Sequence, residues 1–174
     1  LDLDGDAEMV IAAIDKDSEE PVVVALGLPD TGGSLLWEAP LDQGSHPSDP
    51  AFAQTDETTG YVLLTTTQES SGAMWVWKLD SDTGDSNWDG LTLSNSDGDT
   101  SAPHIRLPGP IIAELNGDSD DLEMILTIPT DWDGSNGQDG AEFVGMEIGT
   151  GDELWSFEAS NGFADAPPVA IDTN

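Results

Sequence analysis

Short apolar runs, separated by polar stretches rich in glycine and proline, make up the whole chain. Several of the runs alternate apolar and polar residues, as half-buried strands do, and the period of an amphipathic helix is weak throughout. Glycine and proline mark the turns between the runs. The pattern predicts strands at 9–14, 22–26, 35–38, 51–53, 61–66, 74–79, 111–113, 124–128, 143–147, 154–157 and 169–171. The expected fold class is therefore all-β.

Two landmarks recur and divide the chain into repeats. One is a proline four residues before the start of a loop, at Pro50, Pro110 and Pro168. The other is a Thr-Gly turn followed by a tryptophan, which occurs as Thr31-Gly32 with Trp37, Thr83-Gly84 with Trp88, and Thr150-Gly151 with Trp155. These landmarks predict repeat units at about 1–45, 46–102 and 103–162, with the start of a further unit at 163–174.

Each unit holds about four short strands in roughly 50–60 residues, which fits a blade of a β-propeller. The third unit is longer, and a lengthened hairpin loop at 131–140 accounts for the difference. Three blades do not close a ring, because propellers have about 4–8. We therefore expect a β-propeller fragment of about three four-stranded antiparallel blades with open edges.

Residues 111–126 have the pattern strand, acidic loop, strand. Oxygen-bearing side chains stand at alternate positions around a glycine, and hard oxygen ligands at this density suit Ca²⁺. The candidate ligands here are Glu114, Asn116, Asp118 and Asp120. The first residues repeat the pattern, with Asp2, Asp4, Asp6 and Glu8, and the last residues begin it again at Asp172 and Asn174. The alternative is that these are solvated acidic turns in a chain that is acidic everywhere; the 131–139 loop has the same two interpretations.

The charge of the chain limits its partners. It has 36 acidic and 3 basic residues and a formal net charge of −33, so we expect no nucleic-acid or anionic-membrane partner. Self-repulsion of this size calls for screening salt or bound cations and suggests a salt-adapted protein. There is no cysteine, hence no disulfide or thiol chemistry, and no apolar run of about 20 residues for membrane insertion. Because the chain opens on Leu1, we expect any targeting segment to lie outside it.

The Thr-Gly and tryptophan segments, at 24–37, 76–88 and 144–157, resemble the PQQ-like β-propeller repeat. The acidic loops resemble the calcium loops of FG-GAP repeats, the units of the integrin α-chain propeller. The first resemblance implies that each tryptophan docks between blades. The second implies a closing carboxylate, with Glu123 one residue late for that role and Glu8 two residues early. It also implies no calcium in the second unit, where Gln54, Asp56 and Thr58 stand at the ligand positions.

These expectations favour an extracellular or cell-surface calcium-binding scaffold that takes part in adhesion or binds a protein or carbohydrate ligand. A further hypothesis is an interaction module that self-assembles, its open blade edges pairing with other chains. The alternative is part of a propeller enzyme, either a PQQ-dependent dehydrogenase or a polysaccharide lyase. Such sites need cations, and the chain has only Lys16, Lys78 and Arg106. An exposed row of Trp75, Trp77 or Trp132 would favour sugar binding, whereas burial would favour a scaffold.

Overall fold

The structure is a computed structural model of the 174-residue chain. It describes residues 8–28, 33–56, 58–68, 73–88, 91–93, 108–115, 122–132 and 138–160. Within these ranges the regular structure consists of β-strands joined by turns, with no helix. The predicted all-β class is confirmed. In this part of the chain there is accordingly no helix long and apolar enough to cross a membrane.

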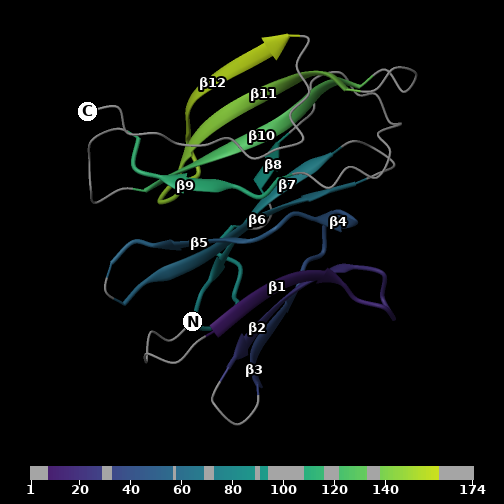
Figure 1. Ribbon diagram of the computed structural model, residues 1–174, viewed down its shortest axis with the longest axis vertical. Helices are drawn as coiled ribbons and strands as arrows, with labels where there is room; N and C mark the ends of the chain where they lie inside the picture. The colour runs from purple at the N-terminus through teal and green to yellow at the C-terminus, as the bar shows by residue number, and fades with distance from the viewer. Residues whose placement is uncertain are drawn as a thin grey trace.

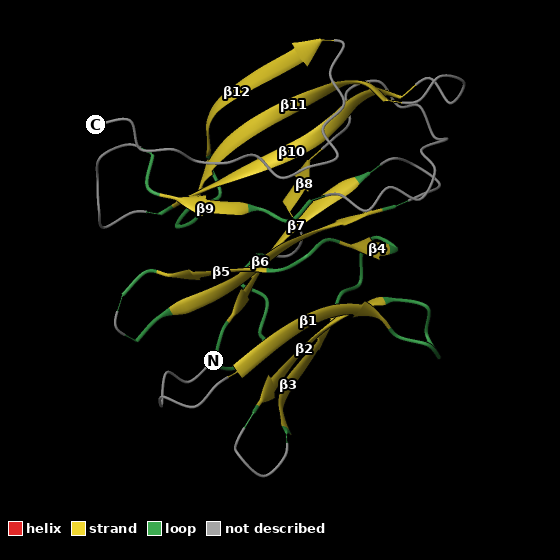
Figure 2. Ribbon diagram, in the orientation of Figure 1, coloured by secondary structure: helices red, strands yellow, loops and turns green. Residues whose placement is uncertain are grey.

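The strands form three antiparallel sheets, shown in Figures 1 and 2. The first sheet has the order β1-β2-β3, with β1 at Glu8–Ile14, β2 at Pro21–Gly27 and β3 at Ser34–Pro40. The second has the order β4-β6-β7-β8, with β5 also paired to β6; its strands are β4 (His46–Pro47), β5 (Ala51–Gln54), β6 (Gly60–Thr67), β7 (Met74–Asp80) and β8 (Leu91–Leu93). The third has the order β12-β11-β10-β9, with β9 at Ile111–Ala113, β10 at Glu123–Trp132, β11 at Gln138–Glu147 and β12 at Glu153–Ser160.

Ten of the predicted strands are present, and all but β9 are longer than predicted, by one to five residues. The short strands β4 and β8 were not predicted, and the predicted strand at 169–171 lies outside the described residues. The proposed extent of the 131–140 hairpin loop is wrong, because β10 and β11 stay paired as far as Trp132 and Gln138. Backbone hydrogen bonds extend this ladder beyond the apolar residues by which the strands were recognised.

The second sheet lies between the other two and is covered on both faces (Figure 1). One core cluster joins it to the first sheet and includes Val23, Trp37, Leu64 and Trp77. Another joins it to the third sheet and includes Leu63, Val76, Met124 and Met146. This double burial explains why β6 is apolar or threonine at nearly every position, whereas β1 alternates between half-buried and exposed residues. None of the three sheets closes on itself among the described residues.

Trp37 joins the first sheet to a turn of the second. Its indole Nε1–H donates to the carbonyl oxygen of Ser81 at 2.7 Å. In this turn a side-chain oxygen of Asp80 accepts the backbone N–H groups of Asp82 and Thr83, each at 3.0 Å. Gly84 ends the turn with φ +76°, and its N–H donates to the carbonyl of Asp80. Gly84 of the Thr-Gly pair thus supplies the left-handed residue that ends the turn, and Trp37 packs against it.

Lys78 joins the second sheet to the third at the matching turn. Its Nζ donates to the carbonyl oxygen of Ile148 at 2.8 Å and lies 4.1 Å from the ring centroid of Tyr61. Ile148 corresponds to Ser81, since the N–H of each donates to a backbone carbonyl at the start of the neighbouring strand, Leu122 just before β10 and Gly60 at the first position of β6. Gly151 ends this turn with φ +80°, and Trp88 lies against it. At both interfaces, therefore, one sheet supplies a donor to the same turn carbonyl of the next.

Substituting Gly84 by alanine tests the fit between turn and tryptophan. We expect Gly84→Ala to lower the free energy of unfolding by at least about 2 kcal/mol. The alanine would have to adopt φ +76°, and its Cβ would lie 2.6 Å from the ring of Trp37. Gly33→Ala is the matched control, because its Cβ would make contacts of 3.4 Å or more. Equal losses in urea unfolding of the two variants would contradict the docking role of this turn.

Lys78→Met tests the second interface. Burial lowers the pKa of Lys78 below 10.5, so in the pH range just below 10.5 the unfolded chain binds more protons than the folded one. Stability therefore rises with pH in that range, and the variant should lack this increment. At pH 7 the variant should lose about 1 to 3 kcal/mol, because the Ile148 carbonyl loses its donor. Urea unfolding at pH 7 and at a pH just below 10.5 measures both effects, with the exposed Lys16→Met variant as control. If Lys78→Met still gains stability between these two pH values as the unsubstituted chain does, the prediction is wrong.

Candidate metal centre

Glu123 is a buried carboxylate on β10, which is an inner strand of the third sheet. It is the first residue of β10 and stands opposite Ala113 of β9 and Glu147 of β11. Its exposed fraction is 0%. The residues that follow it, Met124, Ile125 and Leu126, are all buried apolar side chains. Met124 packs toward the second sheet, and successive side chains of a strand point to opposite faces, so Glu123 is buried on the other face of the third sheet.

Only one of the two carboxylate oxygens of Glu123 has a hydrogen bond among the described residues. Oε2 accepts the backbone N–H of Leu115 at 2.7 Å, whereas Oε1 is buried with no hydrogen-bond partner. An uncompensated buried carboxylate costs several kcal/mol. An oxygen in this state is suited to a cation, because Ca²⁺ takes carboxylate oxygens as ligands at about 2.3–2.6 Å.

The contact between Glu123 and Leu115 spans the predicted calcium loop. Glu114, an exposed residue, and Leu115 follow β9, and Glu123 begins β10, so the hydrogen bond joins the two ends of the loop. The candidate ligands Asn116, Asp118 and Asp120 lie outside the described residues. Glu123 was expected at this loop only from the resemblance, and its burial was not anticipated. The signal available in the sequence was a glutamate directly before the apolar run Met-Ile-Leu.

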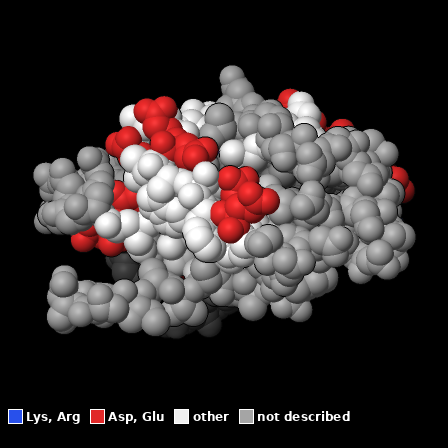
Figure 3. All heavy atoms as spheres, turned by 90° about the horizontal axis from the view of Figure 1, so that it is seen from above, with Lys and Arg blue, Asp and Glu red and all other residues white. Residues whose placement is uncertain are grey.

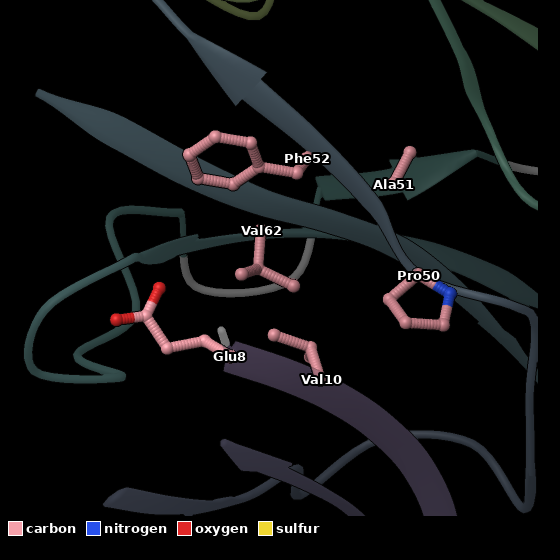
Figure 4. A pocket seen from close by; sticks show the side chains of 6 residues that line it. All are labelled: Glu8, Val10, Pro50, Ala51, Phe52 and Val62. Atoms are coloured by element: carbon pink, nitrogen blue, oxygen red, sulfur yellow. The ribbon is translucent and has the colours of Figure 1, made fainter. Parts of the chain in front are cut away.

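Glu8 occupies the corresponding position in the first sheet. It begins β1, and the sequence Glu-Met-Val-Ile that starts there matches Glu-Met-Ile-Leu from Glu123. Glu8 is half-buried, and it lines a pocket of about 350 Å³ together with Val10, Pro50, Ala51, Phe52 and Val62. Figure 4 shows its carboxylate at one end of this otherwise apolar pocket. The remaining candidates, Asp2, Asp4, Asp6, Asp172 and Asn174, lie outside the described residues.

The described residues hold no group of three or more His, Cys, Asp or Glu side chains arranged to bind a metal. Three of the predicted ligands fall among them, and they are divided between two sheets, with Glu8 in the first and Glu114 and Glu123 at the third. The structure thus places the two ends of the loop in the third unit. The calcium site itself stays a prediction.

Two acidic turns provide a contrast to Glu123. The backbone N–H and the hydroxyl of Thr58 donate to Asp56 Oδ1 at 2.7 and 2.9 Å, and these bonds lower the pKa of Asp56. Asp15 Oδ1 likewise accepts the N–H groups of Ser18 and Asp17, which lowers the pKa of Asp15. Asp56 is exposed and Asp15 is half-buried. In each case the carboxylate accepts hydrogen bonds from residues of its own turn. Acidic turns of this kind do not call for a cation.

Trp75 and Trp77 pack inside the molecule, on the face between the first and second sheets. Trp77 is buried, with its Nε1–H donating to Thr66 Oγ1 at 2.8 Å, and Trp75 is half-buried. The two side chains thus share one face of β7. The side chain of Trp132 lies outside the description. Among the described side chains, these two tryptophans therefore form no exposed row for stacking on a sugar.

The described surface is strongly acidic. Figure 3 shows several groups of Asp and Glu side chains on the face viewed from above, with no Lys or Arg visible among its described atoms. A chain of net charge −33 generates a negative potential that attracts cations and repels anions.

Glu123→Gln tests whether the buried charge is uncompensated when no divalent cation is present. In buffer with a chelator, we expect this variant to unfold at a higher temperature than the unsubstituted chain. The amide oxygen can still accept the Leu115 N–H, while a buried negative charge is removed. Glu158→Gln, on the exposed strand β12, removes the same charge at the surface and should have a much smaller effect. Destabilisation of Glu123→Gln in a chelator would show that the carboxylate is already compensated within the protein.

Comparison of the chain with protein-family models, with curated proteins and with solved structures found no match. The structure establishes the all-β architecture of antiparallel sheets. The resemblance to PQQ-like and FG-GAP propeller repeats remains a prediction from the sequence.

Proposed function

We propose that this chain is a calcium-stabilised segment of a β-propeller, acting as a structural or adhesive scaffold in a secreted or cell-surface protein rather than as an enzyme. The observation that carries the proposal is the carboxylate of Glu123. It is fully buried, one oxygen accepts the N–H of Leu115, and the other has no hydrogen-bond partner among the residues that the structure describes.

The energetic argument starts from the cost of this charge. Burial of a carboxylate without a partner costs several kcal/mol, a large share of the 5–15 kcal/mol by which a domain is typically stable. Leu115 compensates one oxygen only. The six residues between Leu115 and the start of the described chain at Leu122 include Asn116, Asp118, Asp120 and Asp121. A Ca²⁺ ion shared by Glu123 and these side chains would compensate the buried charge.

Calcium would also join two strands of the sheet. β9 ends before the loop and β10 begins after it, and the two strands pair over three residues. Such a short pairing is weak by itself, so an ion that gathers the loop would hold β9 in register. Ion binding would in addition reduce the self-repulsion of a chain with a net charge of −33.

The contacts between sheets support a scaffold. The donors on Trp37 and Lys78 both hold a turn of the next sheet, and Trp75 and Trp77 are used for packing. This repeated docking is what the PQQ-like propeller resemblance implies for successive blades. An extracellular location fits the proposal, because modules of this kind bind calcium at about 10⁻⁴–10⁻³ M. The ligand proposed is a protein or carbohydrate at the cell surface.

Calcium titration with thermal unfolding tests the proposal. At about 100 times the dissociation constant, Ca²⁺ should add about 2.7 kcal/mol of stability. Mg²⁺ at equal ionic strength controls for screening, since it prefers a smaller octahedral site. Asp118→Ala should remove the part of the calcium-induced stability that comes from the third unit. Asp4→Ala should remove a separate part, which comes from the first unit.

In saturating calcium, Glu123→Gln should become less stable than the unsubstituted chain, which reverses the order expected in a chelator. Glu158→Gln should keep the full response to calcium. If Mg²⁺ stabilises the chain as well as Ca²⁺ does, or if Asp118→Ala responds normally, the loops are ordinary acidic turns and the proposal is wrong.

A further inference from the structure

Glu147 is a second carboxylate beside Glu123. The two residues are directly opposite each other on β10 and β11, so their side chains lie on the same face of the third sheet. Directly opposite residues of an antiparallel pair have Cβ atoms about 4.5–5.5 Å apart. Glu123 is 0% exposed and Glu147 is half-buried, and burial strengthens the repulsion between like charges. The pair therefore has an electrostatic cost that a cation between the two carboxylates would remove.

Backbone hydrogen bonds fix the positions of both glutamates. The N–H of Ile148 donates to the carbonyl oxygen of Leu122 at 3.0 Å. This bond joins the residue after Glu147 to the residue before Glu123. The carbonyl oxygen of Glu147 accepts the N–H of Gly151 at 2.9 Å, which closes the turn that follows β11. Because β10 is antiparallel to both of its neighbours, the two glutamates lie at the end of the sheet where β9 ends (Figure 1).

Each glutamate has one carboxylate oxygen without a hydrogen bond among the described residues. In Glu123 this oxygen is the buried Oε1. In Glu147 it is Oε1 as well, because the one hydrogen bond of this carboxylate within the described chain is from the Thr150 hydroxyl to Oε2, at 2.7 Å. Two oxygen ligands at about 2.3–2.6 Å from a Ca²⁺ ion are at most about 5 Å apart. Side chains whose Cβ atoms are about 4.5–5.5 Å apart can meet this condition.

Asp80 shows how a carboxylate binds when it only closes a turn. It precedes the turn after β7 as Glu147 precedes the turn after β11. Asp80 Oδ1 accepts the N–H groups of Asp82 and Thr83, each at 3.0 Å, and the Thr83 hydroxyl at 3.1 Å. Glu147 is one methylene longer and accepts only a hydroxyl from its own turn. The turn therefore uses less of the carboxylate of Glu147 than of that of Asp80.

The second sheet has a cation of its own at the corresponding place. Tyr61 is opposite Asp80, and the ammonium of Lys78 lies 4.1 Å from the centroid of the Tyr61 ring. In the third sheet Glu123 takes the place of the tyrosine and Gly145 takes the place of the lysine. The strands β9–β12 contain no Lys, Arg or His. The third sheet thus has an additional negative charge where the second has a positive one.

We propose that Glu147 is a further ligand of the calcium ion at Glu123, and that this ion joins β11 to β10. The inference rests on the proposed function, because it extends the same site by a ligand from another strand. Two attractive contacts to the ion would replace the repulsion between opposed carboxylates. Neither the spacing of the acidic loop residues nor the resemblance identified Glu147, because it lies outside the loop and follows Gly145 and Met146 at the end of β11.

Calcium titration of Glu147→Gln by calorimetry tests the inference. The amide oxygen can still accept the Thr150 hydroxyl, so the variant removes the charge and keeps the contact within the turn. The dissociation constant for Ca²⁺ at the site that Glu123→Gln weakens should rise at least about tenfold. Thr150→Val removes the contact within the turn and keeps both carboxylates, so it should leave this dissociation constant unchanged.

Glu142→Gln is the matched control for the loss of charge. Glu142 is half-buried on the same strand, but it is five residues from Glu147 and therefore lies on the opposite face of the sheet. This variant should bind Ca²⁺ as the unsubstituted chain does.

Thermal unfolding in a chelator measures the same pair without calcium. Glu123→Gln and Glu147→Gln should each raise the melting temperature. The double variant should gain less than the sum of the two shifts, because either substitution alone already removes the repulsion between the two charges. In saturating calcium each single variant should instead melt below the unsubstituted chain.

Unchanged calcium affinity in Glu147→Gln, or additive shifts in the chelator, would overturn the inference and leave a calcium site at Glu123 standing. Equal weakening by Glu142→Gln would also overturn it, because loss of net charge would then explain the effect. If the unsubstituted chain binds no Ca²⁺, the proposed function fails together with the inference.

Discussion

The contact on which the rest of the structure depends is the one between each sheet and a turn of the next. A turn after a long middle strand exposes a backbone carbonyl, and the preceding sheet supplies its hydrogen-bond donor, Trp37 Nε1 to Ser81 and Lys78 Nζ to Ile148. Both donors are on side chains long enough to bury apolar area while the polar end reaches the turn. These hydrogen bonds join neighbouring sheets beside the apolar clusters that pack between them.

The same contact uses two different chemical groups. At the first interface a tryptophan supplies both the ring against Gly84 and the donor to Ser81. At the second, Trp88 supplies the ring against Gly151, and Lys78 supplies the donor while lying over the ring of Tyr61. One of the chain's three basic residues is therefore used in the interior. In a protein with so few cations, Lys78 serves in the interior as a hydrogen-bond donor to a turn carbonyl.

Negative charge is treated differently at different places in the fold. Asp15, Asp56 and Asp80 each accept backbone N–H groups in their own turns, so these carboxylates are satisfied locally. Glu123 is satisfied at one oxygen and buried at both. The distinction depends on position in the fold, because Glu123 begins an inner strand and is fully buried, whereas Asp15 and Asp80 are half-buried and Asp56 is exposed in turns. The number and spacing of acidic residues along the chain do not distinguish carboxylates that are hydrogen-bonded within their own turns from a buried one such as Glu123.

The all-β class, ten of the strands and the Thr-Gly turns at Gly84 and Gly151 could be predicted from the amino-acid sequence, because apolar alternation and the φ requirement of such a turn are local properties. The burial of Trp37 and the 39% exposure of Trp155 follow from tertiary packing, because both tryptophans come after the same sequence motif. Tertiary packing also decided that Glu123 is buried and Lys78 is a donor to the next sheet. The burial of these side chains and the hydrogen bond of Lys78 depend on which sheet packs beside them, and that sheet is formed by residues distant in the sequence.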